Sequence, residues 1–318
     1  MKALTFSNFG GPEVLEYKEI ASPVAGENEV LIKMKAIGLN YADIYRRRGN
    51  YHLKGNPPFL AGYEGAGIVL KSNSKNFLPG DRVGFADVPY ANAEYVKAPE
   101  EKLIKLPEDI SFENAASILL QGLTAQFLSE ESYSIKENDF VVIHAAAGGV
   151  GQILTQLAKI KNAQVIGLSR KKEKLDIIKE NGAAHAILLN QKWEKEVFKI
   201  TNHGANVVYD SVGNTLNKSL AVTREGGTTV FFGMSGGDPK PIDPRYLMDR
   251  SLKLVGGDLW GYIKSPVKRR KKAANLFSLF RSGKIKIKEP VKFRLEEGRK
   301  AHEFLEFGNS NGKVLLIP

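Results

Sequence analysis

A run of small residues at Ala145–Gly151 has the composition and spacing of a phosphate-binding turn. It follows the apolar segment Phe140–Ala145 and precedes a segment with helical periodicity. Aligned with the pattern G-x-G-x-x-G, its key positions are Ala146, Gly148 and Gly151, with alanine in place of the first glycine. Glycines there let the backbone approach a pyrophosphate, which the unpaired N–H groups of the helix N-terminus attract. We therefore predict a nicotinamide dinucleotide site whose turn residues are Ala146, Gly148, Gly149, Val150 and Gly151.

The segment after the next expected strand, Gln164–Leu168, indicates which nicotinamide is bound. Sites specific for NAD usually place Asp or Glu about 20 residues past the turn, where the carboxylate accepts from the ribose 2′-hydroxyl. This chain has Ser169, Arg170 and several lysines in that region and no acid at the strand end. Hydroxyl and cationic donors suit a 2′-phosphate. A basic helix start is the alternative, although cations there oppose the helix dipole. We predict NADPH.

The composition excludes several kinds of chemistry. The 318 residues include no cysteine and five scattered histidines. Disulfides, thiol nucleophiles and thiolate metal ligands are therefore excluded, no histidine pair has zinc-binding spacing, and we predict no metal. Lys and Arg number 46 against 35 Asp and Glu, a formal charge of +11 that suits an anionic ligand.

Length and hydropathy bound the class of protein. A chain of this length predicts two domains. No apolar run approaches the roughly 18–20 residues needed to span a bilayer. The segment Met1–Phe6 alternates like a strand and lacks the apolar core of a signal peptide. We expect a cytoplasmic protein with no membrane partner.

The first 105 residues or so have the pattern of an all-β domain, in which short apolar segments alternate with turns such as Pro79-Gly80-Asp81. One or two helical turns are expected at Tyr41–Arg48. The expected strands are Lys2–Phe6, Val30–Ala36, Gly67–Leu70, Arg82–Phe85, Tyr95–Ala98 and Leu103–Leu106.

The pattern changes at Ser111, which is expected to cap a helix. Beyond it, buried strands alternate with helices, as in a doubly wound parallel sheet of the Rossmann type, so the fold class is α/β. After a helix near Ala273–Phe280, two terminal strands at Ile285–Ile287 and Val314–Ile317 are expected to rejoin the first domain. The strands expected in between are Phe140–Ala145, Gln164–Leu168, Ala186–Leu189, Val207–Tyr209 and Thr228–Gly233.

These motifs together resemble a known family. The likeness covers nearly the whole chain and centres on Asp139–Lys159, which is similar to the quinone oxidoreductase and zeta-crystallin branch of the medium-chain dehydrogenase/reductases. The other motifs that carry the resemblance are Gly10–Leu15, Ala36–Asn40 with Asp43 and Tyr45, Gly65–Val69, Gly80–Val83, Tyr209–Gly213 and Leu315–Pro318.

The resemblance implies a mainly β GroES-like catalytic domain at residues 1–120, completed by 282–318, and a Rossmann NADPH-binding domain at 121–281. It also implies a zinc-independent reductase that forms a homodimer or tetramer; we expect a homodimer. Zinc-dependent relatives carry Gly-His-Glu where this chain has Gly62-Tyr63-Glu64.

Site residues follow from the resemblance position by position. Asn40, Tyr45 and Tyr51 are expected near the nicotinamide as catalytic residues, where an amide or hydroxyl stabilises charge on the acceptor oxygen. The alternative is that the two tyrosines only pack and that Asn40 only caps a turn. The cofactor contacts implied elsewhere are Thr124, Lys174, Phe232, Gly233 and Met234. Family features are missing at Gln121, Leu188-Leu189 and Met234.

The acceptor is left open between two small-molecule classes. A quinone is the first choice, and an α,β-unsaturated ketone or aldehyde, or an enoyl thioester, is the alternative. A different class of function, RNA binding of the zeta-crystallin type, is suggested by the basic run Lys268–Lys272. No aromatic stacking platform interleaves with that run, so we interpret it as a solvated helix face and expect no nucleic acid partner.

Overall fold

The computed structural model describes residues 1–318, which divide into two compact units. Unit 1 comprises Met1–Leu120, Ile263–Ser278 and Lys288–Pro318, and unit 2 comprises Gln121–Tyr262 and Leu279–Ile287. Unit 1 has two sheets and unit 2 has one, and each unit has its own apolar core. None of the helices is long and apolar enough to cross a membrane.

Unit 2 contains a six-stranded sheet in which every pair of neighbours is parallel. The order is β11-β10-β9-β12-β13-β14, which is 3-2-1-4-5-6 in the order of the unit's strands and is the Rossmann order. The predicted α/β class is confirmed. The strands are β9 (Phe140–Ile143), β10 (Gln164–Ser169), β11 (His185–Leu188), β12 (Ala205–Asp210), β13 (Thr223–Phe231) and β14 (Lys253–Gly256).

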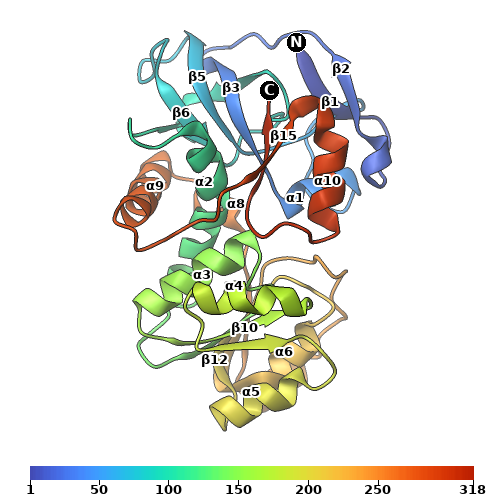
Figure 1. Cartoon of the computed structure of the whole chain (residues 1–318), viewed down its shortest axis with the longest axis vertical. Coiled ribbons are helices and arrows are strands. Elements are labelled where there is room, and N and C mark those ends of the chain that lie inside the picture. Colours follow the sequence, from blue (N-terminus) through green and yellow to red (C-terminus); the bar gives the residue numbers. More distant parts are fainter. The chain divides into compact units, whose positions relative to one another are not determined.

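Helices cover both faces of this sheet. Figure 1 shows α3 and α4 on one side of it and α5 and α6 on the other. Trp193 and Val197 of α5 pack on Val142, Ile166 and Val208 of the sheet. The helices are α3 (Gly149–Ile160), α4 (Leu175–Glu180), α5 (Trp193–Thr201), α6 (Leu216–Val222), α7 (Pro244–Asp249) and α8 (Leu259–Tyr262), with shorter helical turns at η3 (Leu128–Ser132) and η4 (Lys172–Lys174).

Unit 1 is built on two sheets. One has the order β2-β1-β4, and the other has the order β15-β16-β3-β5-β6-β8, with β7 paired to β3. All pairs are antiparallel except β15 with β16. The strands are β1 (Lys2–Phe6), β2 (Glu16–Glu19), β3 (Glu29–Leu39), β4 (Phe59–Leu60), β5 (Gly65–Ser72), β6 (Arg82–Phe85), β7 (Tyr95–Pro99), β8 (Ile104–Lys105), β15 (Val291–Arg294) and β16 (Val314–Ile317).

Few helices accompany these sheets. Helix α2 begins in unit 1 and ends in unit 2, and α9 also extends past the end of unit 1. They are α1 (Tyr41–Arg47), α2 (Phe112–Phe127), α9 (Pro266–Arg281) and α10 (Gly298–Glu306), with short turns at η1 (Pro12–Val14), η2 (Glu100–Lys102) and η5 (Leu295–Glu297).

Several local predictions are confirmed. The strands Lys2–Phe6 and Arg82–Phe85 have the predicted bounds. The Ser111 hydroxyl accepts from the backbone N–H of Asn114 at 3.0 Å, as expected of a helix cap. Strand Val314–Ile317 pairs with β3 and so returns the chain to unit 1, as predicted.

The expected strand at Ile285–Ile287 is wrong. No strand forms there, and the segment belongs to unit 2. The backbone of Lys286 is bonded by one side chain instead of by a neighbouring strand: its N–H donates to Gln156 Oε1 at 2.7 Å, and its carbonyl accepts from Gln156 Nε2 at 2.9 Å. A glutamine amide satisfies both backbone groups, as a strand would.

A buried charged cluster ties α1 to α10. Arg47 is fully buried, and it donates to Glu306 Oε1 at 2.6 Å and to Nδ1 of His302 at 3.1 Å. His302 is itself fully buried. Burial, and after it the charge of the neighbouring Arg47 guanidinium, lowers the pKa of His302 to about 3. The histidine is therefore neutral and accepts from the arginine.

We expect this histidine to make the stability depend on pH. The unfolded chain binds a proton near the ordinary pKa of about 6.5, whereas the folded chain does not bind it until about 3. The free energy of unfolding should therefore fall between these values as pH falls, by up to about 1.4 kcal/mol per pH unit for this group. In His302→Asn, which keeps an acceptor for Arg47, denaturant titrations at several pH values should show a shallower dependence. His185→Asn, on the exposed surface, is the control; an unaltered slope in His302→Asn would contradict the assignment.

Candidate functional site

The small-residue turn of unit 2 joins β9 directly to α3. Ala145 has a left-handed backbone, with φ of 48°, and Gly148 is the extended residue before the helix. A Cβ atom on Gly151 would lie 2.5 Å from the carbonyl oxygen of Ala145 and 2.7 Å from Cα of Ala146. Only glycine allows the helix to pack this closely on the turn. Ala146 is fully buried, and the room for its methyl group comes from Gly167 of β10, where a Cβ would lie 2.9 Å from it.

The first turn of α3 has no side-chain cap. Gly148 offers no side chain, no acidic residue lies in the first turn, and Gly149 and Val150 follow directly. N-terminal N–H groups without a capping oxygen are donors for an anion, and the helix dipole adds attraction. The turn residues named from the sequence therefore lie together in a geometry that fits a diphosphate.

A cationic segment follows β10, the strand next to β9. Ser169 ends the strand, and its hydroxyl both accepts from the backbone N–H of Lys171 and donates to its carbonyl, each at 3.1 Å. Arg170 is exposed, whereas Lys174 is half-buried. Burial lowers the pKa of Lys174 and nearby Lys171 lowers it further, against the opposing effect of Glu173. Cations held close together in this way are stabilised by a bound anion.

The loop after β13, which contains Phe232, Gly233 and Met234, is fastened to the loop after β12. Phe232 N–H donates to the Asp210 carbonyl at 2.9 Å, and Ser235 N–H donates to the Ser211 carbonyl at 3.1 Å. These residues thus lie at the carboxyl edge of the parallel sheet, the edge at which ligands bind in open α/β sheets. Thr124 lies on α2 with 9% of its surface exposed.

Asp210 organises this edge, a role the sequence did not indicate. Its carboxylate accepts from the backbone N–H groups of Val212 and Gly213 at 2.8 and 3.0 Å and from the Ser219 hydroxyl at 2.6 Å. Ser219 also contacts Nε2 of His144 at 2.9 Å, which links the ends of β9 and β12. Burial would raise the pKa of Asp210, but His144 and these hydrogen bonds outweigh it and lower the pKa.

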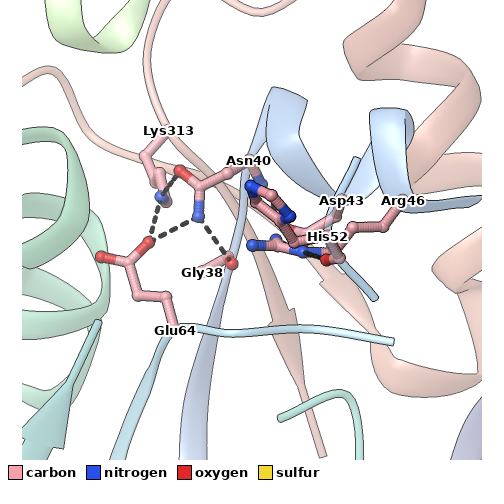
Figure 2. Close-up of polar contacts among 7 residues, drawn as sticks. All are labelled: Gly38, Asn40, Asp43, Arg46, His52, Glu64 and Lys313. Atoms are coloured by element: carbon pink, nitrogen blue, oxygen red, sulfur yellow. Dashed lines mark hydrogen bonds and ion pairs between the residues drawn. The ribbon is translucent and has the colours of Figure 1, made fainter. Parts of the chain in front are cut away.

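In unit 1, Asn40 precedes α1 and is buried. Its amide nitrogen donates to the Gly38 carbonyl at 3.2 Å and to Glu64 Oε2 at 2.8 Å, and its amide oxygen accepts from Lys313 Nζ at 2.7 Å (Figure 2). Both N–H bonds of the amide are therefore engaged inside the protein.

Glu64 and Lys313 complete this cluster, and sequence reasoning named neither as a functional residue. Glu64 is fully buried and Lys313 is 4% exposed, and their charged atoms lie 2.5 Å apart. Glu64 Oε1 also accepts from the backbone N–H of Leu120 in α2 at 2.7 Å. One carboxylate thus connects β5, α2, the residue before α1 and the residue before β16. The Gly62-Tyr63-Glu64 triplet pointed to Glu64, but nothing local singles out Lys313.

The predicted tyrosines lie in one aromatic group. Tyr45 is on α1 and Tyr51 is on the chain beyond it; their ring centroids are 6.2 Å apart in an edge-to-face arrangement. Tyr41 stands 5.8 Å from Tyr45 on the other side. All three side chains are half-buried. The structure thus brings Tyr45 and Tyr51 together, and it places Asn40 directly before the helix that carries Tyr45.

The donors at the triplet do not fit a zinc ion. Glu64 is already bound by Lys313 and Asn40, and the ring of Tyr63 lies 3.5 Å from the guanidinium carbon of Arg46. No group of three or more His, Cys, Asp or Glu side chains that could hold a metal occurs in the chain.

The basic run Lys268–Lys272 lies within α9. The interpretation of this run as a solvated helix face is wrong for its two arginines. Arg269 is buried and donates to the Ile263 carbonyl at 2.8 Å. Arg270 donates to the carbonyls of Leu103 and Glu100 at 3.2 and 2.9 Å. Both arginines therefore fasten the helix to unit 1 instead of presenting their charge to solvent.

Removal of the Lys313 charge should lower the free energy of unfolding. Lys313→Met leaves the Glu64 carboxylate buried without its counter-charge, so we expect a loss of about 3–5 kcal/mol in the free energy of unfolding. The double variant Glu64→Gln, Lys313→Met removes both charges and should recover much of that loss. Urea denaturation measures both. Lys292→Met, which breaks the exposed pair with Glu113, is the control and should cost less than about 1 kcal/mol. Equal losses in the single and double variants would contradict this account.

Two family models match the chain. Residues 26–108 match the alcohol dehydrogenase GroES-like domain, and residues 149–272 match the zinc-binding dehydrogenase family.

Known proteins are similar to this chain over its whole length. A quinone oxidoreductase of Pseudomonas aeruginosa is 37% identical over 324 residues, which cover 100% of this chain and 99% of the relative. A 2-haloacrylate reductase of a Burkholderia species is 32% identical, with 97% and 96% covered. The solved structure of Escherichia coli quinone oxidoreductase complexed with NADPH superposes with a TM-score of 0.96 at 36% identity and covers 100% of both chains. The chain therefore belongs to the quinone oxidoreductase branch of the medium-chain dehydrogenase/reductases and is an oxidoreductase.

Proposed function

We propose that this protein is an NADPH-dependent reductase that transfers a hydride to a quinone. The observation that carries the proposal is the arrangement on the adjacent strands β9 and β10. An uncapped helix N-terminus follows β9, and a cationic segment follows β10. The first suits a diphosphate and the second suits the 2′-phosphate that distinguishes NADPH from NADH. The NADPH complex of the E. coli relative supports the same cofactor.

The residues predicted from the sequence would hold the cofactor as follows. The backbone of Gly148–Gly151 and Ala146 would hold the diphosphate. Ser169, Arg170 and Lys174 would surround the 2′-phosphate, and the exposed Arg170 has the freedom to approach it. Phe232, Gly233 and Met234 would flank the nicotinamide ribose, and Thr124 would contact the cofactor.

When bound, NADPH supplies the hydride from C4 of its nicotinamide. The protein must stabilise negative charge on the acceptor oxygen and deliver a proton to it. We assign the hydrogen bond that stabilises the acceptor oxygen to the hydroxyls of Tyr45 and Tyr51. Asn40, whose two N–H bonds are engaged by Gly38 and Glu64, orients the start of α1 in this proposal and does not donate to the acceptor.

A second acceptor class is supported by one observation. The Burkholderia relative is named for the reduction of 2-haloacrylate, an α,β-unsaturated carboxylate, and is 32% identical to this chain. Reduction of unsaturated carbonyl compounds is therefore the alternative. RNA binding is not proposed, because Arg269 and Arg270 bond backbone carbonyls within unit 1. The homodimer implied by the resemblance and the cytoplasmic location expected from the sequence stay predictions.

An acceptor panel tests the reaction. The loss of NADPH absorbance is followed with benzoquinones, naphthoquinones, enones, alkenals, enoyl thioesters and 2-haloacrylates, and kcat/KM is compared among them. We expect the quinones to give the highest values. A preference for an unsaturated carbonyl compound would replace the quinone by the alternative, and inactivity with every acceptor would contradict the proposed reaction.

Cofactor choice is tested at Lys174. Lys174→Met removes a cation from the proposed 2′-phosphate site, so the KM for NADPH should rise about tenfold, which corresponds to the 1.4 kcal/mol of one charge-assisted hydrogen bond. The KM for NADH, which lacks that phosphate, should not change. Lys179→Met, an exposed change on α4, is the matched control. An equal effect on both nicotinamides would show that Lys174 does not contact the phosphate.

A further inference from the structure

Arg46, which the sequence did not single out, is a buried side chain in contact with Tyr51. It lies in the last turn of α1 and is 3% exposed. Its Nε donates to the His52 carbonyl at 2.9 Å, and its Nη1 donates to Asp43 Oδ1 at 3.1 Å (Figure 2). The guanidinium carbon lies 3.5 Å from the ring centroid of Tyr63 and 5.1 Å from that of Tyr51. The guanidinium thus contacts two rings, a carboxylate and a backbone carbonyl of unit 1.

The segment that carries Tyr51 has no secondary structure of its own to hold it in place. Residues 48–58, between α1 and β4, contain neither helix nor strand. The Arg46–His52 bond joins this segment to α1 one residue past Tyr51, and the Arg46 guanidinium also faces the Tyr51 ring. The same helix carries Tyr45, so Arg46 fixes the two tyrosines against each other.

Neighbouring carboxylates balance the charge of the buried Arg46 guanidinium. Asp43 is buried, and its carboxylate accepts from the backbone N–H of Asn40 at 2.9 Å. Burial raises the pKa of Asp43, and Arg46 opposes that rise. Asp43, Arg46, Glu64 and Lys313 carry two charges of each sign and are linked through Asn40. A buried arginine is stable only in such a balanced arrangement.

The same cations cover the triplet at which zinc-dependent relatives carry Gly-His-Glu. Arg46 lies over Tyr63, and Lys313 binds Glu64. Tyr63 and Glu64 of that triplet are therefore each in contact with a cationic side chain of this protein.

We propose that Arg46 is a positioning residue that holds Tyr51 beside Tyr45 in the orientation in which its hydroxyl serves the acceptor. This inference rests on the proposed function, because it assigns the organisation of the same site. The planar guanidinium is essential, since its carbon lies over the rings of Tyr63 and Tyr51 while its N–H groups donate to Asp43 and to the His52 carbonyl. A lysine ammonium cannot do both.

A double-mutant cycle tests whether Arg46 acts through Tyr51. Arg46→Met and Tyr51→Phe are made singly and together, and kcat is measured with the best acceptor of the panel. Alone, each change should lower kcat, Arg46→Met by about 10- to 100-fold, the loss expected from a misplaced catalytic group. In the Tyr51→Phe background, Arg46→Met should add less than about twofold, because the two changes remove one interaction. Additive losses, or an unchanged kcat in either single variant, would overturn the proposal.

Further variants separate positioning from loss of the fold. Arg46→Lys keeps the charge beside Asp43 and should still lose activity; it replaces Arg46→Met in the cycle if that variant does not fold. The dissociation constant of NADPH should be unchanged in both, because the dinucleotide turn belongs to unit 2. Arg48→Gln removes a cation that is 55% exposed and lies two residues away, and it should leave kcat unaltered. Full activity in Arg46→Lys would show that charge alone suffices and would also overturn the proposal.

Limited trypsin digestion gives a readout that does not require activity. Lys54 is an exposed cleavage site inside the 48–58 segment. Cleavage after Lys54 should be severalfold faster in Arg46→Met and Arg46→Lys than in the wild type and in Arg48→Gln. Equal rates would show that Arg46 does not hold the segment. If no acceptor is reduced, the proposed function fails, yet this digestion still decides whether Arg46 orders the Tyr51 segment.

Discussion

The Glu64–Lys313 pair is the constraint on which unit 1 depends. Two full charges are removed from water there, and in such surroundings either charge alone would be strongly unfavourable. Each must therefore keep its partner, and the elements that carry them must stay in register. Because Glu64 also bonds Asn40 and Leu120, this requirement reaches the starts of α1 and β16 and the middle of α2.

Two features organise unit 2: close packing at glycines and a network of hydrogen bonds. Gly151 and Gly167 give the turn after β9 the space to lie against both α3 and β10. Asp210 then holds the neighbouring loop with four different donors. The first feature is steric and the second is a network of hydrogen bonds. Together they fix the carboxyl edge of the sheet without any ligand.

The sequence predicted what is local. The glycine turn, the cap at Ser111 and the alternation of strands with helices follow from patterns within a few residues, and the structure confirms them. The resemblance to a family supplied the residues expected near the nicotinamide, among them Asn40, Tyr45 and Tyr51. The Ile285–Ile287 segment failed because its alternating pattern is that of a strand, whereas its backbone partner is the side chain of Gln156.

Long-range electrostatics could not be predicted in this way. Glu64 and Lys313 are 249 positions apart, and a lysine before a strand normally lies in solvent. Arg46 belongs to the run Arg46-Arg47-Arg48, which resembles a charged helix end. In the structure the first two are buried and only the third is exposed. Which arginine turns inward depends on Asp43, Tyr63 and Glu306, and these contacts exist only after the chain has folded.

The uncapped start of α3 has a consequence for the lifetime of the protein. A helix that lacks a capping side chain is completed by an anion that binds there, so the diphosphate contacts proposed for this turn would also strengthen the fold of unit 2. Any ligand that binds only the folded chain raises its stability in proportion to the logarithm of its free concentration. The resistance of the enzyme to unfolding would thereby rise with the concentration of free NADPH.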